Sequence, residues 1–263
     1  MWRWTGTHSG KRLLRQQTCE TFSRSKYPRF RQIVLNMERY RWLKRTRRGE
    51  RLVAVNIAAF EAVAGKPGSF DVRMPVIVGK QYHETPVFSD TIKYVVFNPY
   101  WNLTTSIAAN ETLPKLKKDP FYLKKHNMRI FKGWGPDNAL GTLKLVFPNE
   151  YNVYLHDTPA HGLFKKERRA FSHGCIRMDR PVEMASWVLG GEEKGWGQAR
   201  IDEIIAGRQR KVVVLDQPVP VYILYRTAYV DPEDGVLYFY EDIYGRDTLL
   251  AKALFAGNTG RKD

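Results

Sequence analysis

The sequence predicts a mostly β fold with a few helices (an α+β class), and three observations support this prediction. Short segments rich in β-branched and aromatic residues recur between turn signals such as Gly65-Lys66-Pro67-Gly68 and Pro148-Asn149. The few helical segments do not alternate regularly with these strands, which disfavours a parallel βαβ sheet. The hydrophobic share of 43% is large enough to form a core.

The N-terminal part is distinguished by its charge. Residues 1–51 carry fifteen Lys/Arg against three acids, so they hold +12 of the chain's net +16. The apolar positions from Phe30 to Met37 follow helical spacing and predict an amphipathic helix that ends near Leu43. A basic arm is typical of proteins that bind nucleic acid or another anionic polymer, and a solvated arm without a partner is an equally good interpretation.

Strand and helix signals follow in order. Strands are expected at residues 52–57, 72–78, 92–97, 143–147, 152–156, 212–215, 219–225 and 236–240. A helix is expected over Pro181–Leu189, with Asp179 as its cap and Gly190-Gly191 as its end, and a shorter one over Ala199–Ala206.

The strand pattern stops between about residues 104 and 138, where short helices are expected at 107–111 and 120–126. Such an insertion often forms a wall or lid of a binding site, although it can equally cover a sheet edge. The expected organisation is therefore a basic arm and helix over 1–49, a main domain over 50–250 that contains this insertion, and a tail over 251–263.

The run Ser172-His173-Gly174-Cys175-Ile176-Arg177 supplies the groups that thiol catalysis needs. A cysteine attacks a carbonyl as thiolate, and His156, at the end of a predicted strand, can take its proton. The amides of Gly174 and Cys175 can face a developing oxyanion together. The group that orients His156 is expected to be a backbone carbonyl, because on a strand the side chain of Asp157 points away from it.

Other interpretations of the same residues stay open at this point. Cys175 can be a small buried hydrophobe and His156 a hydrogen-bonded core histidine. A zinc site from His156, His161, His173 and Cys175 is disfavoured, because His-X-Cys spacing differs from the C-x₂₋₄-C pairs of closed sites. No cofactor is expected. A disulfide between Cys175 and the other cysteine, Cys19, is also disfavoured, since it would occupy the reactive sulfur.

The spacing of these residues resembles a known family. Fifteen residues separate His156 from Ser172, which fits the H-x₁₄₋₁₇-[ST]-H-G-C-x-[RN] pattern of the L,D-transpeptidases, the YkuD-type enzymes that cross-link cell walls. The flanking segments resemble the larger YcbB-like group of Gram-negative members, and they are residues 37–43, 75–80, 85–89, 97–102, 136–141, 153–159 and 242–247.

The resemblance implies a YkuD-like β-sandwich or barrel and acyl transfer on peptidoglycan. Cys175 would attack the third residue of a donor stem peptide, and the diaminopimelate amine of an acceptor stem would resolve the thioester to a 3→3 link. The implied catalytic residues are Cys175, His156, His173 and Gly174. The implied substrate-binding residues are Arg177, Ser172, Tyr154, Trp101 and Asp157.

The resemblance also implies acylation by carbapenems and a location in the periplasm or cell envelope. The basic arm would then meet an anionic envelope polymer, and nucleic acid is not expected. Water or a lipoprotein lysine as acceptor, and a non-catalytic basic binding module, are the alternatives.

Two departures from the family pattern stand out. The start of the chain lacks the apolar core of a signal peptide, no apolar run approaches eighteen residues, and the modules that precede this domain in larger members are not visible. Residues 131–138 are also shorter than the corresponding capping segment, which predicts a more open cleft.

Overall fold

The computed structural model describes residues 28–43, 50–100, 113–121 and 138–255. These residues form two compact units, one from residues 48–224 and one from the two ends of the chain, up to residue 47 and from residue 225 onward. Among the described residues, no helix is both long and apolar enough to cross a membrane.

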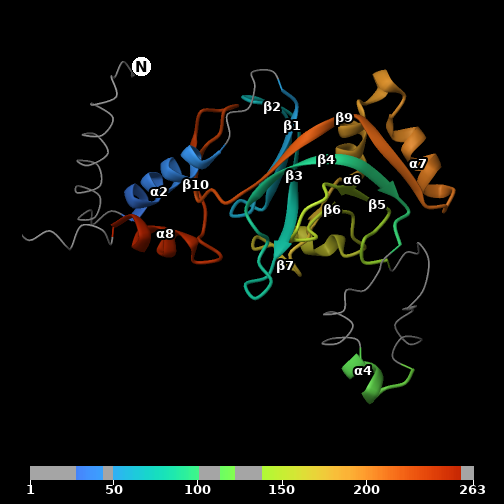
Figure 1. Cartoon of the computed structure of the whole chain (residues 1–263), viewed down its shortest axis with the longest axis horizontal. Helices are drawn as coiled ribbons and strands as arrows, with labels where there is room; N and C mark the ends of the chain where they lie inside the picture. Colours follow the sequence, from blue (N-terminus) through green and yellow to red (C-terminus); the bar gives the residue numbers. More distant parts are fainter. Residues whose placement is uncertain (1–27, 44–49, 101–112, 122–137, 256–263) are drawn as a thin grey trace, which may run out of the picture. The chain divides into compact units, whose positions relative to one another are not determined.

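A nine-stranded mixed sheet dominates the unit of residues 48–224 (Figure 1). The strands are β1 (Leu52–Asn56), β2 (Glu61–Lys66), β3 (Ser69–Gly79), β4 (Phe88–Phe97), β5 (Leu143–Val146), β6 (Leu155–His156), β7 (Ala170–Ser172), β8 (Ile176–Met178) and β9 (Lys211–Leu224). Their order is β2-β1-β9-β4-β5-β6-β8-β3-β7, and β2 also pairs with β3. This extra pairing links the strands from β2 to β3 into a closed circuit, as the predicted sheet-dominated α+β class allows.

The core of this unit follows from alternation along the strands. Leu143 and Leu145 of β5 and Leu155 of β6 are fully buried, whereas Lys144 between the two leucines is only partly covered. One face of these central strands therefore packs in the core, and the opposite face is left for polar side chains.

Helices and short turns complete the unit. They are α4 (Leu113–Lys118), η2 (His161–Lys165), α6 (Pro181–Leu189), η3 (Glu192–Lys194) and α7 (Gln198–Ala206). Helix α6 packs against α7 and the strands β3, β5 and β9. It ends at Gly190 in the left-handed region, as predicted.

The predicted cap of α6 is wrong. Arg180, not Asp179, occupies the N-cap position, and no side chain caps the helix. Pro181 follows at the first helical position, where its missing N–H costs nothing because that donor has no partner inside a helix.

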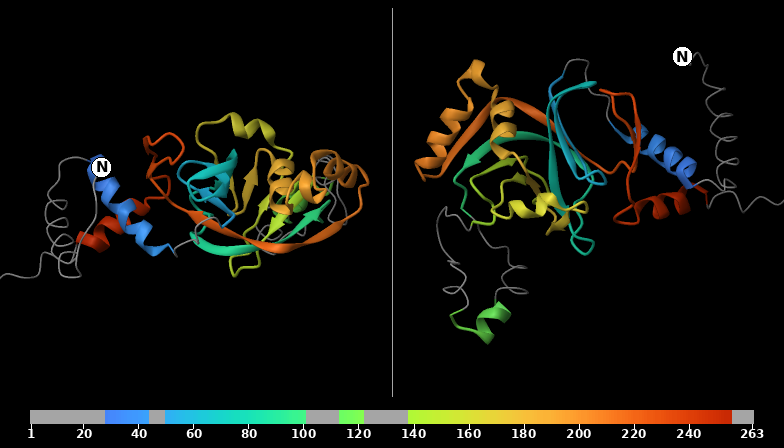
Figure 2. Two further views of the ribbon diagram at one scale, coloured as in Figure 1. Left: turned by 90° about the horizontal axis from the view of Figure 1, so that it is seen from above. Right: turned by 180° about the vertical axis from the view of Figure 1, so that it is seen from behind.

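The strand predictions need three other corrections. The segments expected at 212–215 and 219–225 are one strand, β9, which runs alongside β4 for most of its length (Figure 2). Strands β2, β7 and β8 were not predicted, and the strand expected at 152–156 is only two residues long. Asn152 has a positive φ of 53°, and the side chain of Asn149 hydrogen-bonds the backbone of Val153, so this segment is a turn.

The second unit contains α2 (Pro28–Trp42), the hairpin of β10 (Ala228–Val230) and β11 (Leu237–Phe239), and α8 (Arg246–Phe255). Helix α2 confirms the predicted helix but not its predicted apolar face, because Phe30 and Met37 are exposed. Strand β10 and helix α8 were not predicted. Side chains of α2 connect this helix to the C-terminal segments of the unit. Asn36 donates to Thr227 Oγ1 at 2.8 Å, and Arg39 pairs with Asp247 at 2.5 Å. Two segments that carry the family resemblance, near residues 40 and 245, therefore meet in this unit.

Of the predicted insertion, α4 and residues 119–121 are described. The helix expected at 107–111, most of the one expected at 120–126, and the shortened segment before Asn138 lie outside the described residues. The domain boundaries expected from the sequence stay predictions.

Candidate active site

The central strands place three polar side chains in one row. In the register of the sheet, His156 of β6 lies opposite Lys144 of β5 on one side and Arg177 of β8 on the other. Neighbouring strands lie about 4.8 Å apart, and residues in register share a face. A histidine thus stands between two cations on the face opposite the leucine core.

Cys175 lies in the turn between β7 and β8, immediately before this row. Gly174 has a φ of 108°, a conformation that L side chains rarely adopt, and this allows the tight turn before the cysteine. Ser172 Oγ donates to the Cys175 carbonyl at 2.5 Å and accepts the Gly174 N–H at 3.2 Å. Since this amide is already engaged, the expected pair of Gly174 and Cys175 amides facing an oxyanion does not occur in this geometry.

A loop that follows β3 supports the cysteine turn. Thr85, fully buried, accepts the Gly79 N–H at 2.9 Å and donates to the Gly174 carbonyl, also at 2.9 Å. The Lys80 N–H donates to the Ser172 carbonyl at 3.0 Å. This one loop therefore holds the backbone before the sulfur at both Ser172 and Gly174.

His156 is positioned to accept a proton. Its ring is 4% exposed, and Nδ1 lies 2.5 Å from the Asp157 carbonyl oxygen. Because a carbonyl only accepts, Nδ1 carries the hydrogen and Nε2 keeps its lone pair. The predicted backbone carbonyl partner is confirmed. Burial, with the charges of Arg177 and Lys144, lowers the pKa of His156 to about 3, so the imidazole is neutral at pH 7.

The Cys175 sulfur is partly covered and lies 3.7 Å from the Asn152 carbonyl oxygen. Burial raises the pKa of the Cys175 thiol. Hydrogen bonds from Tyr154 and the positive charges of Lys144 and Arg177 oppose this effect. The free site therefore holds a neutral thiol and a neutral imidazole, and positive charge is available to stabilise a thiolate.

Tyr154 and Arg177 complete the surroundings of the sulfur. Burial raises the pKa of the Tyr154 hydroxyl, which keeps it protonated and able to donate. Burial also lowers the pKa of Arg177. Its buried Nε has no hydrogen-bond partner among the described residues. An unpaired guanidinium nitrogen next to a nucleophile can receive an anionic group.

Two predicted site residues have contacts of a different kind. The Asp157 carboxylate accepts hydrogen bonds from the Thr142 N–H at 2.7 Å, the Thr142 hydroxyl at 2.8 Å and the Thr158 N–H at 2.6 Å. The carboxylate therefore stabilises a turn, and the backbone carbonyl of Asp157 accepts the hydrogen bond from His156. The exposed His173 ring lies 5.0 Å from the His83 ring and 3.3 Å from Lys80 Nζ, so its contacts are with the loop after β3.

Trp101 lies outside the described residues. Within the described ranges, no group of three or more His, Cys, Asp or Glu is arranged to hold a metal ion.

The sequence reasoning missed Lys144 and Thr85. In the sequence, Lys144 is only a lysine between two leucines on a strand. Its place in the site follows from the strand pairing that sets it opposite His156. Thr85 belongs to a segment that resembles the family, but its contact with Gly174, 89 positions away, is visible only in the fold.

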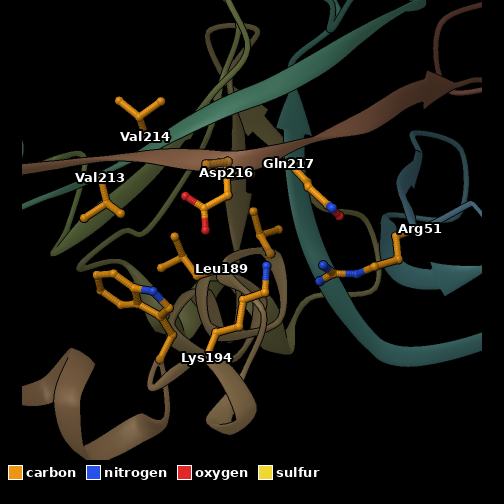
Figure 3. Close-up of a pocket in the computed structure, with 10 residues that line it drawn as sticks. Arg51, Leu189, Lys194, Val213, Val214, Asp216 and Gln217 are labelled. Carbon is orange, nitrogen blue, oxygen red and sulfur yellow. The ribbon is translucent and has the colours of Figure 1, made fainter.

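A small cavity of about 90 Å³ lies elsewhere, between β9 and the end of α6 (Figure 3). Lys194 and Asp216 point into it. The Arg51 guanidinium lies at the rim of the cavity and donates to the Trp187 carbonyl. Its Cζ atom lies 4.2 Å from the centre of the Trp187 ring. None of the residues around Cys175 lines this cavity, so it is separate from the candidate active site.

Comparison with known proteins defines the class. The family model of the YkuD L,D-transpeptidase catalytic domain matches residues 50–221, and the chain belongs to this family. A curated protein of Haemophilus influenzae, named "Putative L,D-transpeptidase", is 30% identical over 240 residues, which are 82% of this chain and 48% of that protein. The chain thus spans about half the length of this relative.

Similar solved structures carry the same name. An L,D-transpeptidase from Mycobacterium smegmatis is 16% identical with a TM-score of 0.34, over 66% of this chain and 58% of that one. L,D-transpeptidase 3 from Mycobacterium tuberculosis, solved with a faropenem-derived adduct, is 14% identical with a TM-score of 0.36, over 66% and 59% of the two chains.

Proposed function

We propose that this chain is the catalytic part of a peptidoglycan L,D-transpeptidase that forms 3→3 cross-links through a cysteinyl thioester. The observation that carries the proposal is the alignment of the His156 imidazole and two cations beside the Cys175 turn, in a chain that belongs to the YkuD family. A thiol, a base whose lone pair is free, and charges for anionic substrates are what acyl transfer from a stem peptide requires.

In the first half of the reaction, Cys175 gives its proton to His156 Nε2 as its sulfur attacks the carbonyl of the third donor residue. The Asp157 carbonyl accepts the Nδ1 hydrogen and so stabilises the imidazolium that forms. The Tyr154 hydroxyl and the Cys175 N–H are the donors for the developing oxyanion. The imidazolium then protonates the departing D-alanine amine, and a thioester is left on Cys175.

In the second half, the side-chain amine of an acceptor diaminopimelate attacks the thioester. His156 takes the amine proton and returns it to the departing sulfur, which restores the thiol and yields the 3→3 amide. Arg177, with its unpaired Nε, binds a stem carboxylate. The site lies in the periplasm or cell envelope, where this substrate is found.

The acceptor is tested by incubating the protein with disaccharide-tetrapeptides and separating the products by mass spectrometry. We expect 3→3 dimers and released D-alanine. Tripeptide without dimers would overturn the assignment of acceptor and favour a carboxypeptidase, and transfer only to a lipoprotein lysine would favour an anchoring enzyme. No product of any kind, with folded protein, would favour the non-catalytic basic binding module. Cys175→Ala provides the control without nucleophile.

A further inference from the structure

Lys144 lies beside the nucleophile although it belongs to a strand far from the Ser-His-Gly-Cys run. Its neighbours Leu143 and Leu145 are fully buried in the core, so alternation along β5 turns Lys144 to the opposite face. The register places it directly across from His156. The lysine therefore shares a face with the proposed base.

Two cations flank this base in one row across the sheet. Lys144 precedes His156 and Arg177 follows it on adjacent strands. Like charges this close repel each other, and Arg210 adds to the positive charge that faces Lys144. This concentration of positive charge around one histidine costs folding free energy, and an anion at this place, such as a thiolate, offsets the repulsion.

Tyr154 connects Lys144 to the sulfur. The Lys144 ammonium lies 4.6 Å from the centre of the Tyr154 ring, a distance at which a cation is attracted to the aromatic face. The side chain of the same tyrosine is hydrogen-bonded to Cys175. The ring also packs edge-on against His156, with ring centres 5.6 Å apart. A change at Lys144 thus reaches both reacting side chains through one aromatic ring.

We propose that Lys144 is a positioning residue for the nucleophile: its ammonium holds the Tyr154 ring against Cys175 and supplies positive charge that favours the thiolate. The proposal rests on the proposed function in taking Cys175 as the reacting group. Lys144 acts through Tyr154 and through its charge, and it need not touch the substrate.

The electrostatics of the site support this role. The charged or titratable groups that face Cys175 are Lys144 from β5, Tyr154 and His156 from the β6 segment, and Arg177 from β8. Lys144 and Arg177 both lower the pKa of the thiol against the effect of burial. Lys144 also helps to keep His156 neutral and able to accept a proton.

The test measures the reactivity of the thiol without any peptidoglycan substrate. The rate of alkylation of Cys175 by iodoacetamide is followed by mass spectrometry across pH 6–10.5, in a Cys19→Ser background. The variants are Lys144→Met and Lys144→Gln, which remove the charge, and Lys144→Arg, which keeps it. Lys93→Met on the exposed side of β4 is the matched control.

We expect the rate at pH 7.5 to fall about three- to tenfold in both neutral variants and their profiles to move to higher pH. Lys144→Arg should stay within about threefold of the unmodified site, because its charge and ring contact persist. The Lys93→Met profile should not change. A merely structural role would change the unfolding midpoint without moving the pH profile.

Profiles of Lys144→Met and Lys144→Gln that coincide with that of Lys93→Met would overturn the proposal. This outcome is distinct from failure of the proposed function. Dimers can still form while Lys144 proves irrelevant, and the alkylation profile can shift in a protein that makes no cross-links.

Discussion

Two polar clusters of this molecule use buried charge in opposite ways. In the unit built from the chain ends, Arg39 pairs with Asp247, their side chains are 10% and 15% exposed, and the same carboxylate accepts from Thr227. Around Cys175, the buried Nε of Arg177 has no partner among the described residues, and the Lys144 ammonium faces an aromatic ring. Breaking a buried ion pair leaves an uncompensated charge and destabilises the fold, whereas a charged group without such a partner is available to a substrate.

The comparison predicts that the largest effect on chemistry comes from the proposed base. His156→Ala should lower the rate of carbapenem acylation about 10²–10⁴-fold, because it removes the proposed base, whose Nε2 lone pair takes the thiol proton. Stopped-flow or timed mass spectrometry measures this rate. His161→Ala, on an exposed short helix, should acylate nearly normally. The reverse result would overturn the choice of base.

The largest effect on stability should come from the paired cluster. Arg39→Met leaves the Asp247 carboxylate mostly buried without its cation, and the expected cost is about 3–5 kcal/mol of unfolding free energy. Urea unfolding followed by tryptophan fluorescence measures it. Arg41→Met is the control, because the Arg41 side chain is 55% exposed whereas that of Arg39 is 10% exposed, and losing its pair with Glu38 should cost about 1 kcal/mol or less. Equal costs would contradict the view that Arg39 is structural.

Arg177→Met should show the opposite balance. Removing a guanidinium whose buried Nε has no hydrogen-bond partner among the described residues should leave the unfolding free energy within about 1 kcal/mol. The kcat/KM for a tetrapeptide donor should fall about 10–100-fold, as expected for a lost charged hydrogen bond. Arg177→Lys should recover only part of the loss, since an ammonium cannot form two parallel bonds to a carboxylate. A variant that loses stability but keeps its donor kinetics would place Arg177 with the structural cluster.

A further effect concerns pH, and it accumulates gradually across several pH units. Burial, with Arg177 and Lys144, lowers the pKa of His156 from its ordinary 6.5 to about 3. Between these values the unfolded chain binds a proton that the folded one does not. The unfolding free energy should therefore fall as pH decreases from 6.5 toward 3, by at most about 1.4 kcal/mol per pH unit. His156→Gln should reduce this slope. An identical slope in the two proteins would show that His156 does not contribute.

The sequence predicted the part of the site that is local in the chain, and missed the part that depends on strand pairing. Cys175 and His156 stand in a recognisable spacing, and the carbonyl partner of His156 followed from strand alternation. Lys144 could not be assigned, because its meaning lies in its register with another strand. The contact of Thr85 with Gly174 joins residues 89 positions apart, so no local pattern could reveal it.

The same reason explains the fold predictions. Strands with continuous apolar patterns were found, and so was α2. Strand β9 was divided in two because Asp216-Gln217-Pro218 has the composition of a turn. In the structure the strand continues through this stretch, and β4 pairs with the residues on either side of it, 211–214 and 219–223, with an irregular register between them. The helix α8 was missed because its side toward α2 is defined by tertiary contacts and not by a strong apolar stripe.

The central claim is that Cys175 is an acylated nucleophile, and intact-protein mass spectrometry with a carbapenem tests it most directly. We expect one covalent adduct, located on the peptide that contains Cys175 and absent from Cys175→Ala. An adduct that persists in Cys175→Ala, or a folded protein that forms none, would contradict the account.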